Sequence, residues 1–287
     1  MTYTTLISVA QLQSLQASGI PLMVFDCSFE LMKPETGPLQ YLESHLPGAV
    51  YAHLDAALSD ESGATDTASG GRHPLPSREK FAAWLSSVGF DNGMQAVVYD
   101  RNGATYCGRL WWMLKWAGHD AVALLDGGLQ AWTAAGGATA LGAGLAQQAS
   151  NFTLAPTLRG LVATQSVANQ LGKPGQTVID ARAAPRFKGE VEPIDPVAGH
   201  IPGALNRPST LNIGADGKFK PAALLKAEFE ALLGGRDPAT VVHHCGSGVS
   251  AVPNVIAMEL AGLGTTGLYA GSWSEWCTTP GLPVARG

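Results

Sequence analysis

The feature that most constrains the fold is an internal repeat, which extends over much of the 287-residue chain. Moving the first half forward by 144 positions, the separation of Arg101 and Cys245, places residues 97–132 over residues 241–276. Identical residues then meet at Val97, Val98, Ala117, Gly118, Leu124, Gly127 and Trp132. The repeat predicts that one domain fold is built twice along the chain.

Two shorter motifs extend the repeat upstream. "SHLPGAV" at 44–50 matches "GHIPGAL" at 199–205, and "VFDC" at 24–27 matches "VIDA" at 178–181. Their offset is about ten residues longer, so loops of unequal length separate the matched blocks. Because His45 and His200, and likewise Asp26 and Asp180, occur in both copies, we predict structural roles for them. Arg182 is interpreted as an ion-pair partner near the core.

Each half has the pattern of an α/β domain. "AVVYD" (96–100) and "TVVHH" (240–244) are short apolar runs typical of buried parallel strands. "GRLWWMLKWAG" (108–118) and "AVPNVIAMELAG" (251–262) are helical patterns closed by glycine, with Pro253 in the first turn. Trp111, Trp112 and Trp116, at helical spacing, are predicted to pack in the core and between domains. The predicted fold is a tandem repeat of two α/β domains, each a parallel β-sheet flanked by helices.

The length suits two hydrophobic cores. We predict an N-terminal domain at 1–136 and a linker at 137–155, because residues 134–150 are rich in glycine and alanine and carry no charge. A C-terminal domain at 156–287 follows, and it alone carries the candidate reactive cysteine.

Composition excludes several classes of protein. The formal charge of -5 and the lack of any Lys/Arg cluster argue against nucleic acid as a partner. No apolar run is long enough to cross a bilayer, and the N-terminus lacks a signal-peptide pattern, so a cytoplasmic location away from membranes is expected. Four widely spaced cysteines predict free thiols, with neither a disulfide framework nor a zinc site: Cys27, Cys107, Cys245 and Cys277. Of these, Cys27, Cys107 and Cys277 lie outside any glycine loop and are interpreted as inert.

The loop "CGSGVSA" at 245–251 distinguishes the two halves. At the 144-residue offset Cys245 faces Arg101, and the small residues 246–248 face 102–104, "NGA". A feature needed only to build the domain would occur in both copies. The cysteine loop is therefore interpreted as chemistry.

Such a loop can hold an anion around the sulfur. Cys245 follows a predicted central strand, where open α/β sheets bind ligands, and a helix begins a few residues later. Small side chains let the amide N–H groups turn inward, and the helix N-terminus adds partial positive charge. This arrangement favours a thiolate and, after reaction, a persulfide anion.

Three chemistries are possible for a cysteine in this loop. A cysteine phosphatase needs an arginine to bind phosphate bidentately, and that position holds Ala251. Metal binding by His243, His244 and Cys245 is disfavoured because alternate strand residues face opposite sides, and hydrogen bonding at the strand end explains the histidines better. Sulfur transfer through a cysteine persulfide is contradicted by nothing in the loop.

The repeat, "DGGLQAW", "GHIPGA", "CGSGVSA" and "GSWSEW" together resemble the two-domain rhodanese-like sulfurtransferases over essentially the whole chain. "CGSGVSA" is similar to the loop of the 3-mercaptopyruvate sulfurtransferases, with Ser250 in place of threonine. The resemblance implies transfer of a sulfane sulfur from 3-mercaptopyruvate to cyanide or thiol acceptors, a thioredoxin-like reductant among them, without cofactor or metal. The alternatives are a thiosulfate:cyanide sulfurtransferase and a non-catalytic persulfide carrier.

The resemblance also implies roles for individual residues. Arg186 would bind the donor carboxylate, whereas residues 190–196, "EVEPIDP", lack the family's second arginine, so donor binding is expected to be weaker or its preference shifted. Ser247, His73 and Asp55 would manage the donor's proton, in a cleft between the repeats. The loop residues that would line the substrate site are Gly246, Gly248, Val249 and Ser250. The alternatives are a surface arginine at 186, a helix cap at Asp55 and a solvated loop residue at His73.

Overall fold

The computed structural model describes residues 2–63, 65–144 and 147–287. The chain divides into two compact units. The first unit comprises Met1–Asp60, Pro76–Leu158 and Ala215–Lys218, and the second comprises Glu61–Leu75, Arg159–Gly214 and Phe219–Gly287. No helix in the described ranges combines the length and apolar character needed to cross a membrane.

The first unit alternates strands and helices. Its elements are β1 (Leu6–Ile7), α1 (Val9–Ala17), β2 (Leu22–Asp26), α2 (Thr36–Glu43), β3 (Val50–Tyr51), α3 (Leu54–Ala57), α4 (Arg78–Ser87), β4 (Gln95–Tyr99), α5 (Thr105–Trp116), β5 (Val122–Leu125) and α6 (Gly128–Ala134).

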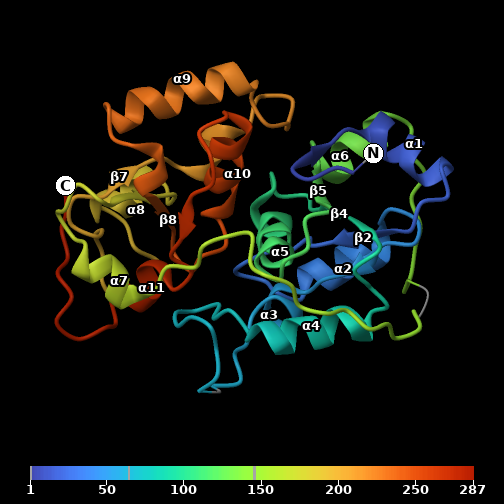
Figure 1. Cartoon of the computed structure of the whole chain (residues 1–287), viewed down its shortest axis with the longest axis horizontal. Coiled ribbons are helices and arrows are strands. Elements are labelled where there is room, and N and C mark those ends of the chain that lie inside the picture. The colour runs from blue at the N-terminus through green and yellow to red at the C-terminus, as the bar shows by residue number, and fades with distance from the viewer. Residues whose placement is uncertain (1, 64, 145–146) are drawn as a thin grey trace. The chain divides into compact units, whose positions relative to one another are not determined.

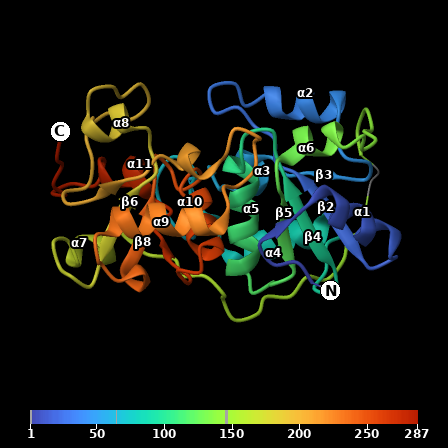
Figure 2. The same cartoon turned by 90° about the horizontal axis from the view of Figure 1, so that it is seen from above.

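Its five strands form a parallel sheet in the order β1-β5-β4-β2-β3 (Figure 2). On one face α1, α2 and α6 pack through Leu12, Tyr41 and Trp132 against Val24 and Val97. On the other face the Phe25 ring contacts the rings of Trp84 in α4 and of Phe90, and α5 packs against β4 and β5. Because both faces are covered, every residue of β4 is buried.

The second unit repeats the pattern. Its elements are α7 (Thr164–Asn169), β6 (Thr177–Asp180), α8 (Ala184–Lys188), β7 (Leu205–Asn206), η1 (Ser209–Asn212), α9 (Ala222–Leu233), η2 (Pro238–Thr240), β8 (Val241–His244), α10 (Val252–Leu260), β9 (Gly267–Leu268) and α11 (Ser272–Trp276).

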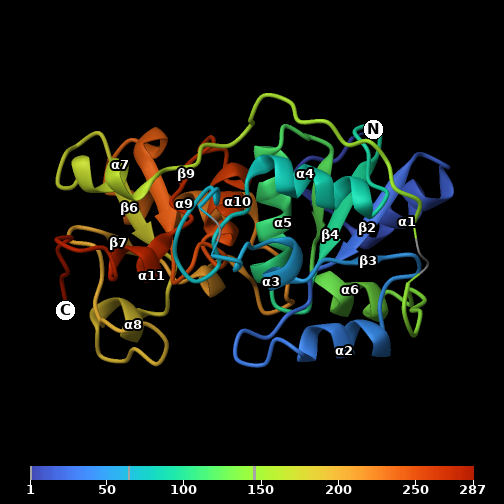
Figure 3. The same ribbon diagram turned by 90° about the horizontal axis from the view of Figure 1, so that it is seen from below.

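Its parallel sheet has the order β7-β6-β8-β9. Leu161 forms a parallel bridge with Leu268 at the edge of the sheet, beside β9. This bridge is equivalent in position to β1, which lies beside β5 in the first unit. Helices α9 and α10 cover one face of the sheet, and α7 and α11 cover the other (Figures 1 and 3). The two sheets therefore share one strand order, as the repeat predicted.

The predicted fold class is confirmed: each half is a parallel sheet flanked by helices. The predicted strands correspond to β4 and β8, and the predicted helices to α5 and α10, which are followed by Gly118 and Gly262 at positive φ. Pro253 lies in the first turn of α10. Trp111 and Trp112 are 0% exposed and Trp116 is 6% exposed, as expected of core residues.

One segment lies in a different unit from the one that its place in the sequence suggested. Residues 61–75 come from the first half of the chain, yet they belong to the second unit. The amide N–H of Arg72 donates to Ser274 Oγ at 3.0 Å, and a Cβ atom on Gly71 would lie 2.5 Å from the carbonyl oxygen of Gly271. The glycines at 70 and 71 thus allow this segment to lie directly against the start of α11.

The predicted linker at 137–155 includes residues 145–146, which lie outside the described residues. Beyond them the segment packs on the first unit, where Phe152 is 5% exposed and its ring lies 5.8 Å from that of Phe90. The predicted domain boundaries themselves stay a prediction.

Candidate active site

Cys245 follows the last residue of β8, the strand between β6 and β9. Its N–H donates to Ser272 Oγ at 3.1 Å, and its carbonyl accepts from the amide of Trp273 at 2.9 Å. The carbonyl of Gly246 accepts from the amide of Ser274 at 2.9 Å. The backbone at the cysteine is thereby fixed to the start of α11, and the residue is 1% exposed.

The loop after the cysteine depends on glycine. Gly248 has φ +76°, and a Cβ atom there would lie 2.2 Å from the carbonyl oxygen of Ala270. Any larger residue would have to move that backbone as well as adopt a left-handed conformation. The Val252 amide then donates a hydrogen bond to the Val249 carbonyl in a turn, and α10 begins at Val252.

The equivalent loop of the first unit shows what this backbone can bind. There the carboxylate of Asp100 accepts four main-chain hydrogen bonds. Oδ1 accepts from the amides of Asn102 (2.8 Å) and Ala104 (3.1 Å), and Oδ2 accepts from those of Tyr106 (2.9 Å) and Cys107 (3.0 Å). This loop is therefore an anion-binding site that the chain fills with its own carboxylate.

The second unit has an equivalent loop, but the residue that corresponds to Asp100 is not an acid. Ala104, with φ +66°, corresponds to Gly248, with φ +76°, so both loops have a left-handed residue at the same position. Asp100 corresponds to His244, whose Nδ1 lies 3.2 Å from the Cys245 carbonyl and whose Nε2 lies 3.6 Å from Asp180 Oδ2. No carboxylate is supplied from position 244.

Several loop amides of the second unit consequently lack an acceptor in the part of the chain that the structure describes. Within the described ranges, the N–H groups of Gly246, Ser247, Val249 and Ser250 donate to no backbone or side-chain acceptor. At the 144-residue offset Gly246 and Ser250 correspond to Asn102 and Tyr106, whose amides bind the Asp100 carboxylate in the first unit. The arrangement suits a negatively charged group on the sulfur.

His73 and Ser247, both predicted site residues, are in contact. His73 Nδ1 lies 2.7 Å from Ser247 Oγ, and the two residues are 4% and 6% exposed. His73 lies in segment 61–75, which the bond between the Arg72 amide and Ser274 attaches to α11. The alternative of a solvated loop histidine is therefore wrong. The contact is buried and attaches segment 61–75 to the cysteine loop.

Asp55 belongs to the first unit. It lies in the first turn of α3, whose N-cap is His53, and the Asp55 amide donates to His53 Nδ1 at 3.1 Å. The N-cap of α3 is thus His53 and not Asp55. Burial raises the pKa of the Asp55 carboxyl, and nearby His53 opposes this rise. Its predicted place beside the cysteine loop stays a prediction.

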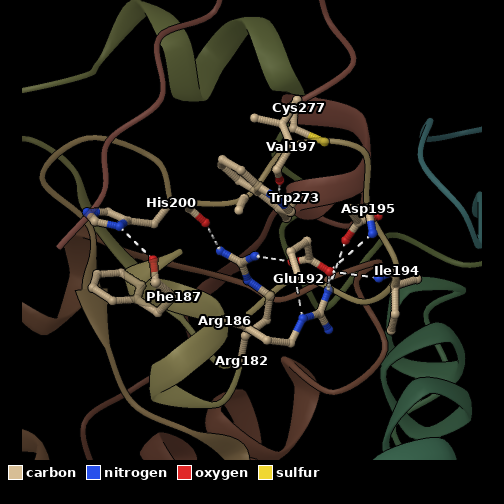
Figure 4. Close-up of polar contacts among 12 residues, drawn as sticks. Arg182, Arg186, Phe187, Glu192, Ile194, Asp195, Val197, His200, Trp273 and Cys277 are labelled. Atoms are coloured by element: carbon tan, nitrogen blue, oxygen red, sulfur yellow. Dashed lines mark hydrogen bonds and ion pairs between the residues drawn. The ribbon is translucent and has the colours of Figure 1, made fainter. Parts of the chain in front are cut away.

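Arg186 in α8 is held by two buried acids. Its Nε and Nη2 donate to Glu192 at 3.2 and 2.6 Å, and Nη2 also contacts Asp195 Oδ2 at 3.0 Å (Figure 4). The side chains of Glu192 and Asp195 are 3% and 2% exposed. Burial raises the pKa of Glu192, but hydrogen bonds from Arg186 and from backbone amides outweigh it and leave the pKa below its usual value. Arg186 is therefore not an ordinary surface arginine.

Sequence reasoning missed Arg72, Glu192 and Asp195. Arg72 Nη1 donates to Asp195 Oδ1 at 2.6 Å, so Asp195 binds Arg72 and Arg186 together. The signals were present in "GRHPLP", beside His73, and in "EVEPIDP", which was noted only for lacking an arginine. The contact joins segments more than a hundred residues apart, and no local pattern indicates it.

The adjacent histidines face different surroundings, as strand alternation requires. His243 Nε2 lies 3.2 Å from Met258 Sδ, whereas His244 faces Asp180. Both are 0% exposed. Burial lowers the pKa of His243 to about 3, and nearby His244 and Arg207 add to this effect.

At the other three cysteines the thiolate is disfavoured. Cys27 and Cys107 are buried, and burial first, then nearby aspartates, raises the pKa of each thiol well above its usual value. Burial also raises the pKa of Cys277. A raised pKa disfavours the thiolate, which is the nucleophilic form.

The residues shared by both copies have matching structural roles. The Nδ1 of His45 lies 2.8 Å from the carbonyl oxygen of Tyr41, and the His45 ring stacks on the Tyr41 ring. In the same way, His200 Nδ1 lies 2.8 Å from the carbonyl oxygen of Phe187, and the two rings stack. Arg182, with its side chain 1% exposed, pairs with Asp180 at 2.7 Å. These predictions are confirmed.

The fold and the loop now define a class. The model of the rhodanese-like domain matches residues 8–135 and 163–279, most of the chain. The chain belongs to the rhodanese-like family, and with two such domains it is a sulfurtransferase of the tandem type. The resemblance inferred from its motifs is confirmed.

Individual proteins are similar to this chain over almost all of its length. A Pseudomonas aeruginosa protein named probable 3-mercaptopyruvate sulfurtransferase is 45% identical over 290 residues, covering 100% of both chains. A Mycobacterium tuberculosis protein named putative thiosulfate sulfurtransferase is 40% identical over 98% of this chain and 97% of its own. The structure of 3-mercaptopyruvate sulfurtransferase from Leishmania major is 30% identical, with TM-score 0.81, over 97% of this chain and 76% of that one.

Proposed function

We propose that the protein transfers sulfur from 3-mercaptopyruvate to cyanide or a thiol through a persulfide on Cys245. One observation carries the proposal. The loop whose amides bind the Asp100 carboxylate in the first unit has a cysteine in the second unit, and there the amides of 246, 247, 249 and 250 donate to no acceptor among the described residues. A charged sulfur is the group that this site would stabilise.

In the first step the Cys245 thiolate attacks the sulfur of the donor. A sulfur–sulfur bond forms, the carbon–sulfur bond of the donor breaks, and its electron pair leaves on carbon as the enolate of pyruvate. The proton of the donor thiol moves to that carbon and gives pyruvate, while the persulfide remains as an anion. Ser247 and His73, 2.7 Å apart, are placed to carry this proton.

In the second step the acceptor attacks the outer sulfur of the persulfide. Cyanide leaves as thiocyanate and a thiolate leaves as its persulfide, and in both cases the Cys245 thiolate is restored. We propose a thioredoxin-like reductant as a protein acceptor and the cytoplasm as the location. Four free cysteines suit that reducing compartment.

The proposal is tested by weighing the intact protein after treatment with 3-mercaptopyruvate. Wild type should gain the mass of one sulfur, lose it on addition of cyanide, and release an equal amount of thiocyanate. Cys245→Ser should gain nothing, whereas Cys277→Ser, the matched control, should behave like wild type. A sulfur retained on Cys245→Ser, or none on wild type, would refute the proposal.

Thiosulfate is the second candidate donor, because a relative 40% identical over almost the whole chain is named for it. The loop argues against it, since residues 246–250 carry no basic side chain for a dianion. We expect kcat/KM for 3-mercaptopyruvate to exceed that for thiosulfate in one cyanide-dependent assay. The reverse order would favour the thiosulfate activity.

A further inference from the structure

We propose that Arg72 is a second donor-binding arginine, which binds the 3-mercaptopyruvate carboxylate together with Arg186. This inference rests on the proposed function. Segment 190–196 lacks the family's second arginine. Arg72, which lies in the loop that carries His73, would take the role of that arginine.

Both guanidinium groups lie against the residue that follows the cysteine. A Cβ atom on Gly246 would lie 3.2 Å from Arg72 Nη2, and 3.6 and 3.8 Å from Arg186 Nη1 and Nη2. Two cationic side chains from distant segments thus meet beside Cys245. Because residue 246 is glycine, no side chain separates them from the loop.

The guanidinium nitrogens nearest Gly246 are also those whose N–H groups are not used by the two acids. Asp195 accepts from Arg72 Nη1 and from Arg186 Nη2, and Glu192 accepts from the Nε and Nη2 of Arg186. Among the described residues, Arg72 Nη2 and Arg186 Nη1 donate to no acceptor, and neither does the buried Nε of Arg72. A planar carboxylate with two oxygens matches these donors.

Asp195 sets the spacing of the two arginines. Its two oxygens bind one guanidinium each, at 2.6 and 3.0 Å, and its side chain is 2% exposed. Figure 4 shows Asp195 and Glu192 on the same side of the Arg186 guanidinium. The acids bind Nε and Nη2 of Arg186 and leave Nη1, 3.6 Å from the Cβ position of Gly246, for a ligand.

The chemistry of the donor fits this position. In 3-mercaptopyruvate only a methylene and a carbonyl carbon separate the sulfur from the carboxylate. A donor whose sulfur meets Cys245 therefore has its carboxylate in the immediate neighbourhood of Gly246. The side chains of Arg72 and Arg186 are 26% and 19% exposed, so solvent and a small ligand can approach them.

The inference is tested with Arg72→Ala in steady-state assays. Because a hydrogen bond to a charged group contributes roughly 1.5–3 kcal/mol, we expect KM for 3-mercaptopyruvate to rise about tenfold or more. The value of kcat should stay within about twofold. Arg72→Lys should fall between, because an ammonium keeps the charge without the fork. Arg236→Ala, whose guanidinium bonds only to the Leu233 carbonyl among the described residues, is the control and should match wild type.

A binding measurement separates recognition from chemistry. In a Cys245→Ser background, titration calorimetry with 3-mercaptopyruvate should show a Kd about tenfold higher when Arg72→Ala is added, and an intermediate Kd with Arg72→Lys. An unchanged KM and Kd in folded Arg72 variants, with an active wild type, would overturn this inference and leave the proposed function standing. A wild type without turnover of 3-mercaptopyruvate would overturn both.

Discussion

At the residue scale, the proposed site combines a nucleophile, a proton relay and a pair of cations. In the proposed reaction Cys245 carries the sulfur, and His73 and Ser247, in contact at 2.7 Å, move a proton. Arg72 and Arg186 are held by the same aspartate. Only the thiol of the donor brings a proton to the reaction, so the relay should matter for one donor and not for the other.

Ser247→Ala should therefore lower kcat for 3-mercaptopyruvate by about 10²-fold, the low end for general acid–base catalysis. With thiosulfate, which has no thiol proton, kcat should change by no more than about twofold. The measurement is thiocyanate formation with each donor, and Ser166→Ala on α7 is the control. Equal losses with both donors would show that Ser247 only supports the loop.

At the element scale, β8 and the loop after it have their counterparts in β4 and the Asp100 loop. The two loops share a left-handed residue and differ in whether a carboxylate or a cysteine is present. Strand β8 is also buried throughout, which places two neutral histidines inside the second unit. That burial has a consequence for stability.

The free energy of unfolding should fall as the pH is lowered from about 7 to 5, because histidines bind protons in the unfolded chain but stay neutral when buried in the fold. Burial lowers the pKa of His243 to about 3 in the folded protein, whereas an unfolded histidine titrates near ~6.5. Between these values the unfolded state holds more protons, so the free energy of unfolding rises with pH and levels off above ~6.5.

His243→Leu should lower this pH slope by about one proton, as measured by chemical unfolding across that range. His244→Gln is a useful comparison, because burial lowers the pKa of His244 also, while Asp180 opposes the shift. A slope identical to that of wild type would mean that His243 is protonated inside the fold.

At the scale of the whole molecule, periodicity and the repeat were sufficient to predict the fold, because each predicted strand and helix is a local pattern. That the two loops bind different groups was also predictable, since comparing the two copies shows where their residues differ. The position of segment 61–75 was not, because a bond between residues 202 apart leaves no local trace. For the same reason Arg72 and the two acids were missed, whereas Arg186 and His73 were found through resemblance.

The account depends on amides of the second loop binding a charged sulfur, and a crystal structure of the protein treated with 3-mercaptopyruvate tests this most directly. The measured quantities are the distances from the outer persulfide sulfur on Cys245 to the loop amide nitrogens. We expect at least two of Gly246, Ser247, Val249 and Ser250 to lie within hydrogen-bonding distance of that sulfur. A persulfide directed away from the loop, with those amides bonded to other acceptors, would contradict the account.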